Sequence, residues 1–141
     1  VLFRSFSLGG NQTLWAAAFD QRIKAAVIAS GVSTLRGDRN WRELWVRESG
    51  NFHYFPRLTE GQFDFHEIAA LIAPRTLLMI SGYHDQWCPG TAIMGEFATR
   101  VHNMYDSYGK AAAFAHVHHG EGHAFSATWR RLAYDWLEKN L

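Results

Sequence analysis

The sequence has little cysteine, little proline and almost no excess charge. Its single cysteine, Cys88, excludes an internal disulfide framework and a zinc site made of four cysteines. Lys and Arg together number 14 against 13 for Asp and Glu, so the net charge of +1 provides no basic surplus for holding nucleic acid. No apolar run approaches the roughly 20 residues that a membrane-spanning helix needs. We therefore expect neither a nucleic-acid partner nor a membrane partner.

The composition favours a folded core. The 141 residues are 48% hydrophobic and only 19% charged, which argues against disorder. Because roughly 100–200 residues commonly form one domain, the length alone predicts a single globular domain. The chain begins with Val1 rather than Met, so we expect its natural N-terminus to be missing. No secretory signal pattern is visible, but without the N-terminus this leaves the location open, with a cytoplasmic one favoured.

The first five residues have an unusual sequence, VLFRS. This pentapeptide is what the end of a common sequencing-adapter oligonucleotide encodes when it is read in frame. On this hypothesis the natural sequence begins at Phe6, and residues 1–5 are non-native and carry no function. The alternative is that they form an ordinary strand end.

Short apolar runs alternate with helical patterns along the chain. Residues 25–30, 76–81 and 114–118 are predicted to be buried strands. A helix is predicted at residues 11–19. Two more are predicted at residues 41–46 and 65–73, within or at the end of an irregular, aromatic-rich section at residues 38–67. Apolar residues at helical spacing predict two further helices, and we expect the apolar stripe of each to pack in the core. The first stripe consists of Ile93, Phe97, Val101, Met104, Tyr105 and Tyr108. The second consists of Trp129, Leu132, Ala133, Trp136 and Leu137. This alternation predicts an α/β fold with a mostly parallel sheet flanked by helices.

Three residues with catalytic potential each follow a strand, and the first of these strands is a further one, predicted at the start of the chain before Ser7. Ser7 lies on a tight strand-to-helix turn, Asp85 follows residues 76–81, and His123 follows the last strand in a glycine-flanked loop. In parallel sheets, chemistry takes place just past the carboxyl ends of the strands. Serine, then Asp, then His is a known chain order for an acyl-transfer triad. The backbone N–H of Leu8, at the start of the helix, is a candidate donor to an oxyanion.

Several segments resemble the α/β-hydrolase superfamily, and within it the branch of dienelactone hydrolases, acetyl xylan esterases and prolyl oligopeptidases. They are residues 6–11 (FSLGGN), 20–25 (DQRIKA), 63–67 (FDFHE), 72–75 (IAPR), 80–85 (ISGYHD) and 122–125 (GHAF). The resemblance extends from Phe6 to the end of the chain but corresponds only to the C-terminal half of such a domain. Residues 1–141 are therefore expected to be a partial α/β-hydrolase domain, with an aromatic-rich insertion at residues 38–67.

The resemblance implies a serine esterase that needs no cofactor. It implies Ser7 as nucleophile, Asp85 as acid, His123 as base and the Leu8 N–H as one oxyanion donor. The expected substrate is a small-molecule or carbohydrate ester. Since the earlier strands and the loop that gives the second oxyanion donor are missing from the chain, we expect the 141 residues alone to be poorly active or inactive. One departure is Ser5, which stands where the G-x-S-x-G motif of the family has glycine.

Other interpretations remain open from the sequence. The branch includes peptidases of the prolyl oligopeptidase type, and a hydrolase fold can serve binding without catalysis. His116 and His118 share one strand face and could hold a metal with Asp85, Cys88 or His123, as in a metal-dependent hydrolase.

Individual residues also have alternative interpretations. Ser7 could act only as a helix cap, and Asp85 only as a turn residue. His119 is the reserve candidate for the base. Cys88 is expected to be a small core or pocket residue. The aromatic residues of section 38–67 either pack onto the sheet or, with Trp87, line an acyl or sugar cleft.

Overall fold

The computed structural model describes residues 1–33, 63–88 and 91–140, of which residues 91–93 are described by their backbone alone. Four parallel strands form one sheet in the order β1-β2-β3-β4, so neighbours in the sheet are also consecutive in the described chain. The strands are β1 (Leu2–Phe6), β2 (Ala25–Ala29), β3 (Thr76–Gly82) and β4 (Phe114–His119). The α-helices are α1 (Leu8–Phe19), α3 (Phe65–Ala70), α4 (Thr91–Ser107) and α5 (Ala127–Lys139), and a short 3-10 helix, η3, covers Ala111–Ala113.

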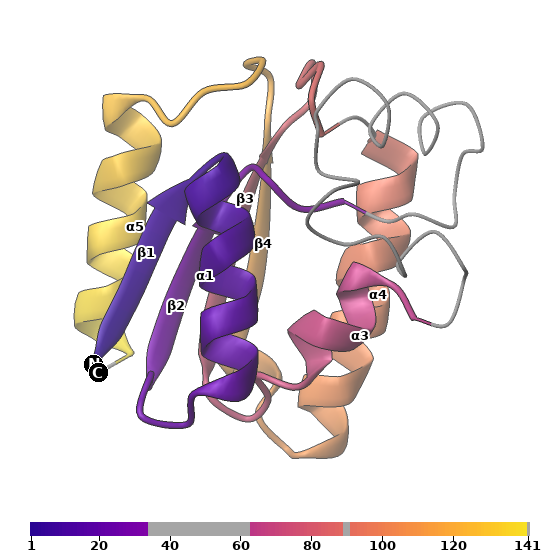
Figure 1. Ribbon diagram of the computed structural model, residues 1–141, viewed down its shortest axis with the longest axis vertical. Coiled ribbons are helices and arrows are strands. Elements are labelled where there is room, and N and C mark those ends of the chain that lie inside the picture. The colour runs from indigo at the N-terminus through magenta and orange to yellow at the C-terminus, as the bar shows by residue number, and fades with distance from the viewer. Residues whose placement is uncertain (34–62, 89–90, 141) are drawn as a thin grey trace.

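The sheet lies between two layers of helices. Helices α1, α3 and α4 cover one face, and α5 covers the other (Figure 1). Strands β2 and β3 are buried along their whole length, because helices pack on both of their faces. The predicted α/β architecture with a parallel sheet is confirmed, and the three strand predictions agree with β2, β3 and β4 to within one residue at each end.

Helix α1 begins at Leu8, three residues before the predicted start at residue 11. Gly9 and Gly10 lower the intrinsic helix propensity, which explains the late prediction. The close packing of the helix requires glycine here, since a Cβ on Gly10 would lie 2.5 Å from the carbonyl oxygen of Ser30. The packing of α1 on the sheet therefore overrides local propensity.

Helix α4 packs through a narrower stripe than predicted. Phe97, Val101 and Tyr105 are buried, but Met104 and Tyr108 are 40% and 56% exposed, so their assignment to the core was wrong. Met104 precedes Tyr105 by one residue, which turns it about 100° around the helix. Tyr108 lies beyond the end of α4 at Ser107. The buried stripe is completed by Met94 instead.

Helix α3 is shorter than the predicted helix at residues 65–73, and Asp64 and Glu67 form a capping box at its start. In α5, Ala133 and Leu137 are buried, and Trp129, Leu132 and Trp136 pack partly buried around them. The predicted helix at residues 41–46 and most of the section 38–67 lie outside the described residues. Among the described helices, none has the length and apolar character needed to cross a membrane.

Candidate active site

Ser7 lies at the sharp turn between β1 and α1. Its backbone has φ 58° and ψ −126°, a positive φ that is uncommon for a residue other than glycine. Two hydrogen bonds hold this conformation: the Ser7 N–H donates to the Ala29 carbonyl (2.9 Å), and the Ser7 carbonyl accepts from the Asn11 N–H (3.1 Å). The Ser7 side chain makes no capping hydrogen bond, so the interpretation of Ser7 as a helix cap is wrong. The turn thus leaves the Ser7 hydroxyl available for another partner.

Two glycines make room for this turn. The chain leaves β2 through Ser30 and Gly31 with φ of 53° and 80°, and a Cβ on Gly31 would lie 1.9 Å from the Ser7 carbonyl oxygen. A Cβ on Gly9 would lie 2.1 Å from the Ser5 hydroxyl oxygen. Ser5, the departure from the family motif, is therefore accommodated because residue 9 has no side chain.

Asp85 lies in the loop of residues 83–88 that follows β3, here called the Asp85 loop. The residue is only 3% exposed. Its Oδ1 accepts hydrogen bonds from the backbone N–H groups of Trp87 (2.8 Å) and Cys88 (3.0 Å). Its Oδ1 and Oδ2 lie 2.9 and 2.8 Å from Nδ1 of His123. These partners fix the carboxylate in one orientation.

His123 lies in the loop of residues 120–126 between β4 and α5, here called the His123 loop. Its Nε2 lies 2.8 Å from the Ser7 hydroxyl oxygen, and its ring packs 4.8 Å from the ring of Phe6. Because an ionised Asp85 can only accept, Nδ1 carries the proton and Nε2 is left to accept from the Ser7 hydroxyl. The structure thus brings Ser7, His123 and Asp85, all three predicted from the sequence, into one continuous chain of hydrogen bonds.

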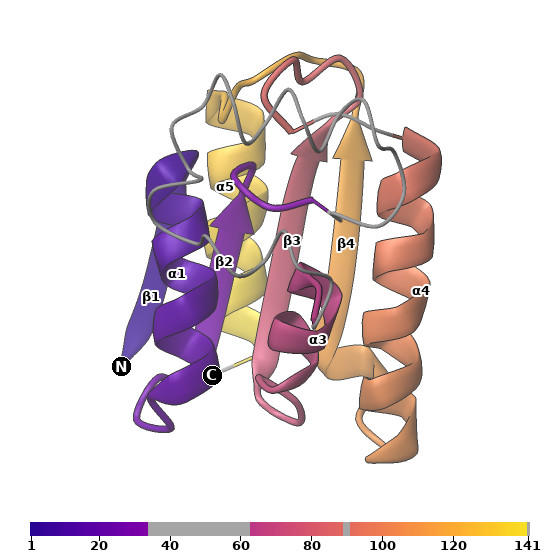
Figure 2. The same cartoon turned by 45° about the vertical axis from the view of Figure 1, so that its right-hand side comes forward.

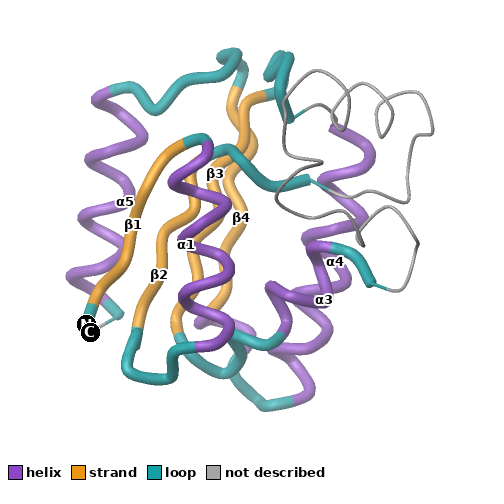
Figure 3. Tube along the Cα trace, viewed as in Figure 1, coloured by secondary structure: helices purple, strands orange, loops and turns teal. Residues whose placement is uncertain are grey.

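The Asp85 loop is bonded to the His123 loop and to the end of β4, and the end of β3 lies against the His123 loop. The Tyr83 N–H donates to the His119 carbonyl (2.6 Å), and the His84 N–H donates to the Glu121 carbonyl (3.2 Å). A Cβ on Gly82 would lie only 2.2 Å from the Gly122 carbonyl oxygen. The turn after β1 and these two loops lie at the same end of the sheet, where the parallel strands end (Figures 2 and 3).

Comparison with known proteins identifies the family. A model of the family described as the prolyl oligopeptidase family matches residues 5–141. The chain belongs to the prolyl oligopeptidase family. It is 30% identical over 140 residues to YtaP of Bacillus subtilis (strain 168), which is named as a hydrolase; the match covers 94% of this chain and 43% of YtaP.

Solved structures with the same fold include two glucuronoyl esterases. The enzyme from Caldicellulosiruptor kristjansonii, of carbohydrate esterase family 15, has a TM-score of 0.78 and 23% identity over 98% of this chain. The catalytic domain from Hypocrea jecorina has a TM-score of 0.76 and 22% identity over 97% of this chain. At these identities the likeness shows the α/β-hydrolase fold. The chain spans 42% and 43% of the two structures, so it corresponds to less than half of each.

The three histidines of β4 in this prolyl oligopeptidase family member have other partners than Ser7. Burial, aided by neighbouring His118, lowers the pKa of His116 to about 4, and the His116 Nε2 lies 3.1 Å from the Ser81 hydroxyl. Burial also lowers the pKa of His118 and His119. His119, the reserve candidate for the base, stacks on Trp129 at 4.7 Å. Within residues 1–33, 63–88 and 91–140, no group of three or more His, Cys, Asp or Glu is placed to hold a metal.

Cys88 connects the Asp85 loop to the end of β2. Its Sγ accepts a hydrogen bond from the Gly31 N–H (3.1 Å), and the side chain is buried, as expected for a core or pocket residue. Burial, reinforced by the Asp85 carboxylate, raises the pKa of the thiol to about 12. The group is therefore a protonated thiol at neutral pH and a poor nucleophile.

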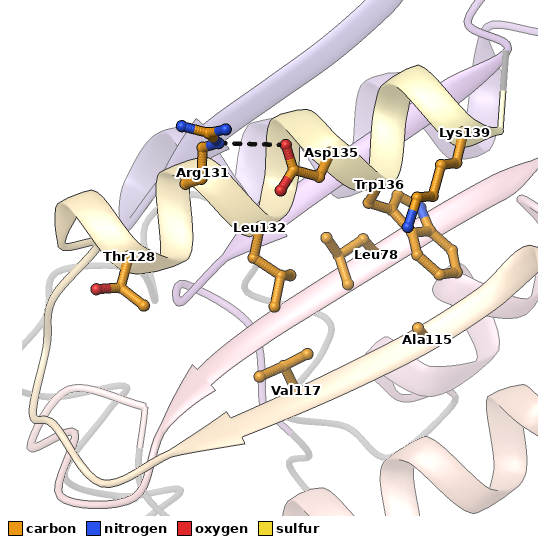
Figure 4. Close-up of a pocket in the computed structure, with 9 residues that line it drawn as sticks. All are labelled: Leu78, Ala115, Val117, Thr128, Arg131, Leu132, Asp135, Trp136 and Lys139. Atoms are coloured by element: carbon orange, nitrogen blue, oxygen red, sulfur yellow. Dashed lines mark hydrogen bonds and ion pairs between the residues drawn. The ribbon is translucent and has the colours of Figure 1, made fainter.

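A groove of about 520 Å³ lies on the α5 face of the sheet, away from the site. It is lined by Leu78 and Val117 of the sheet and by Leu132 of α5, and Arg131 and Asp135 of α5 form an ion pair beside them (Figure 4). None of Ser7, Asp85 and His123 lines it.

The sequence did not point to several residues that support the site. These are Glu121, whose carbonyl receives the bond from the Asp85 loop, and the backbone N–H groups of Trp87 and Cys88. Their only sequence signal is their nearness to Asp85 and His123.

Proposed function

We propose that this chain carries the nucleophile, acid and base of a serine hydrolase that cleaves carboxylic esters through an acyl-enzyme. The observation that carries the proposal is the hydrogen-bonded order Ser7–His123–Asp85, with heavy-atom separations of 2.8 to 2.9 Å. A serine hydroxyl becomes a nucleophile only when a base can take its proton, and the base needs a partner that fixes its tautomer. Each requirement is met by one of these side chains.

The proposed reaction begins when the Ser7 oxygen attacks the ester carbonyl carbon and His123 Nε2 takes the hydroxyl proton. Asp85 stabilises the resulting imidazolium, and the Leu8 N–H at the start of α1 donates to the new oxyanion. His123 then gives the proton to the alcohol oxygen as the C–O bond breaks, which leaves the acyl group on Ser7. A water molecule then attacks the acyl carbon while His123 takes a proton from the water. His123 returns this proton to the Ser7 oxygen as the carboxylic acid leaves.

The substrate proposed is an ester of a small molecule or a carbohydrate. The names of the similar glucuronoyl esterases support a carbohydrate ester. A second candidate, peptide cleavage, is supported by the match to the prolyl oligopeptidase family. The two are separated by comparing kcat/KM for an acetylated or methyl-esterified sugar, a p-nitrophenyl ester and a peptidyl p-nitroanilide. Esterase function requires the ester substrates to be turned over and the anilide not to be.

The test is made in the natural protein that contains these residues. Ser7→Ala is expected to lower kcat/KM for the ester by about 10⁴–10⁶-fold, because it removes the nucleophile. A fluorophosphonate probe is expected to label the wild type at Ser7 and to leave the variant unlabelled. Ser107→Ala, which truncates an exposed serine of α4, is the matched control and should behave as wild type. Ester hydrolysis by Ser7→Ala at the wild-type rate would contradict the proposal.

A further inference from the structure

The His123 loop is fastened by a side chain that the proposed mechanism does not use. Glu121 reaches across the loop to the start of α5, where its Oε1 accepts hydrogen bonds from the Trp129 indole N–H (3.1 Å) and the Ser126 hydroxyl (3.2 Å). Ser126 is the residue directly before α5, and Trp129 lies in its first turn. In Figure 1 the loop crosses the end of the molecule from β4 to α5. The carboxylate thus closes the His123 loop back onto the helix that follows it.

The same tryptophan is held from its face by His119, the last residue of β4. The two rings stack at 4.7 Å with an angle of 17° between their planes, and His119 is 3% exposed. The Nδ1 of His119 accepts a hydrogen bond from the Glu121 N–H (3.2 Å). The ring face of Trp129 therefore packs on the end of β4, and its N–H is bonded to Glu121. Since Trp129 belongs to α5, these contacts join the strand before the His123 loop to the helix after it.

Glu121 also links the His123 loop to the Asp85 loop. Its carbonyl accepts from the His84 N–H, next to Asp85 in the sequence. Its N–H, carbonyl and carboxylate therefore bond to β4, the Asp85 loop and α5 respectively. Among the described residues of the loop, Glu121 alone has all three attachments, and it stands two positions before His123.

We propose that Glu121 is a positioning residue that holds His123 at hydrogen-bonding distance from Ser7, an inference that rests on the proposed function. Proton transfer requires the His123 Nε2 to stay within about 3 Å of the Ser7 oxygen, and a displacement of about 1 Å can lower the rate about 100-fold. The Glu121 side chain is exposed, so water screens its charge. Its effect therefore comes from the hydrogen bonds that its oxygen accepts, which a glutamine can also accept.

Four variants of the natural protein test this assignment. Glu121→Ala removes the acceptor and is expected to lower kcat by about 10- to 100-fold, with KM nearly unchanged and the rate of fluorophosphonate labelling reduced by the same factor. Glu121→Gln keeps the acceptor and is expected to restore most of the activity. Trp129→Phe keeps the stack on His119 but loses the indole N–H. Its kcat is expected to lie between those of Glu121→Ala and Glu121→Gln. Glu138→Ala, an exposed carboxylate of α5, is the matched control.

Hydrogen exchange of the backbone separates the positioning role from other outcomes. Exchange in residues 120–126 is expected to quicken in Glu121→Ala and to stay at the wild-type rate in Glu121→Gln. A wild-type kcat in Glu121→Ala, or equal losses in the Ala and Gln variants, would overturn the assignment. A wild-type protein that the probe does not label would refute the proposed function instead. In that case the exchange rates still show whether Glu121 orders the loop.

Discussion

The histidines of β4 and the histidine of the following loop differ in how the fold uses their ring nitrogens. His116, His118 and His119 lie on the strand, and burial lowers the pKa of all three. Among the described residues, the buried Nε2 atoms of His118 and His119 have no hydrogen-bond partner, and the Nε2 of His116 lies 3.1 Å from the Ser81 hydroxyl. His123 lies in the loop, and both of its nitrogens are bonded, one to a carboxylate and one to a hydroxyl.

This difference teaches where proton transfer can take place. A buried histidine kept uncharged cannot readily become the imidazolium that acid–base catalysis needs, because burial disfavours the charged form. A histidine beside a carboxylate can, because the negative charge stabilises the imidazolium. The four histidines lie within eight residues, so the environment of each ring, and not its position in the sequence, separates the proposed catalytic His123 from the three of β4.

The largest expected effect comes from replacing the loop histidine, and it is compared with the replacement of a strand histidine. His123→Ala is expected to lower kcat/KM by about 10⁴–10⁶-fold, since Ser7 then has no base. His116→Gln should leave kcat/KM close to the wild-type value, because His116 bonds to Ser81 and not to Ser7. Steady-state kinetics on an ester substrate measure both. A comparable loss of kcat/KM in the two variants would contradict the distinction between the histidines of β4 and His123.

An intermediate effect is expected where the end of β3 touches the His123 loop. A Cβ on Gly82 would lie 2.2 Å from the Gly122 carbonyl oxygen and 2.6 Å from that of Glu121, so Gly82→Ala must push the His123 loop away. We expect kcat to fall by about 100-fold. Gly120→Ala is the control, because a Cβ there meets nothing within 4 Å. If both variants kept the wild-type kcat, this close packing would not matter for the site.

The smallest expected effect is a change in the pH dependence of stability. His116 has a pKa of about 4 in the folded protein against 6.5 for an ordinary histidine, so between these values the unfolded state binds a proton that the folded state does not. The free energy of unfolding therefore decreases as the pH falls from about 6.5 to about 4. His116→Gln should reduce this slope by up to about 1.4 kcal/mol per pH unit.

Urea unfolding at pH 7, 6 and 5 measures that slope. His102→Gln, which replaces an exposed histidine of α4, serves as the control. An identical slope in wild type and His116→Gln would mean that His116 is charged in the folded protein. In that case the contrast between strand and loop histidines would not hold for this residue.

Much of the fold could be predicted because buried parallel strands must be apolar on both faces. The runs that became β2 and β3 carry this signal. The start of α1 at Leu8 could not be predicted, since Gly9 and Gly10 disfavour a helix until the packing against Ser30 is known. The exposure of Met104 was missed for a similar reason, because helical spacing gives the direction of a face and not its width.

The site could be predicted as far as it depends on chain order. Ser7, Asp85 and His123 each follow a strand, and a parallel sheet brings those strand ends to one edge. Glu121 could not be predicted, because a Gly-Glu-Gly sequence is typical of any turn and its partners belong to a later helix. Which backbone groups hold Asp85 likewise depends on how the loop folds back on itself.

The order of the strands has a consequence for folding kinetics. Each strand pairs with the strand before it, so the sheet can grow one crossover at a time from either end. The hydrogen bond from Ser7 to His123, in contrast, joins residues 116 positions apart and needs every strand in place. Loop closure over such a separation is slow and depends on the contacts in between. On the proposed function, a chain in which the four described strands are not all paired keeps His123 away from Ser7, and its serine is not activated.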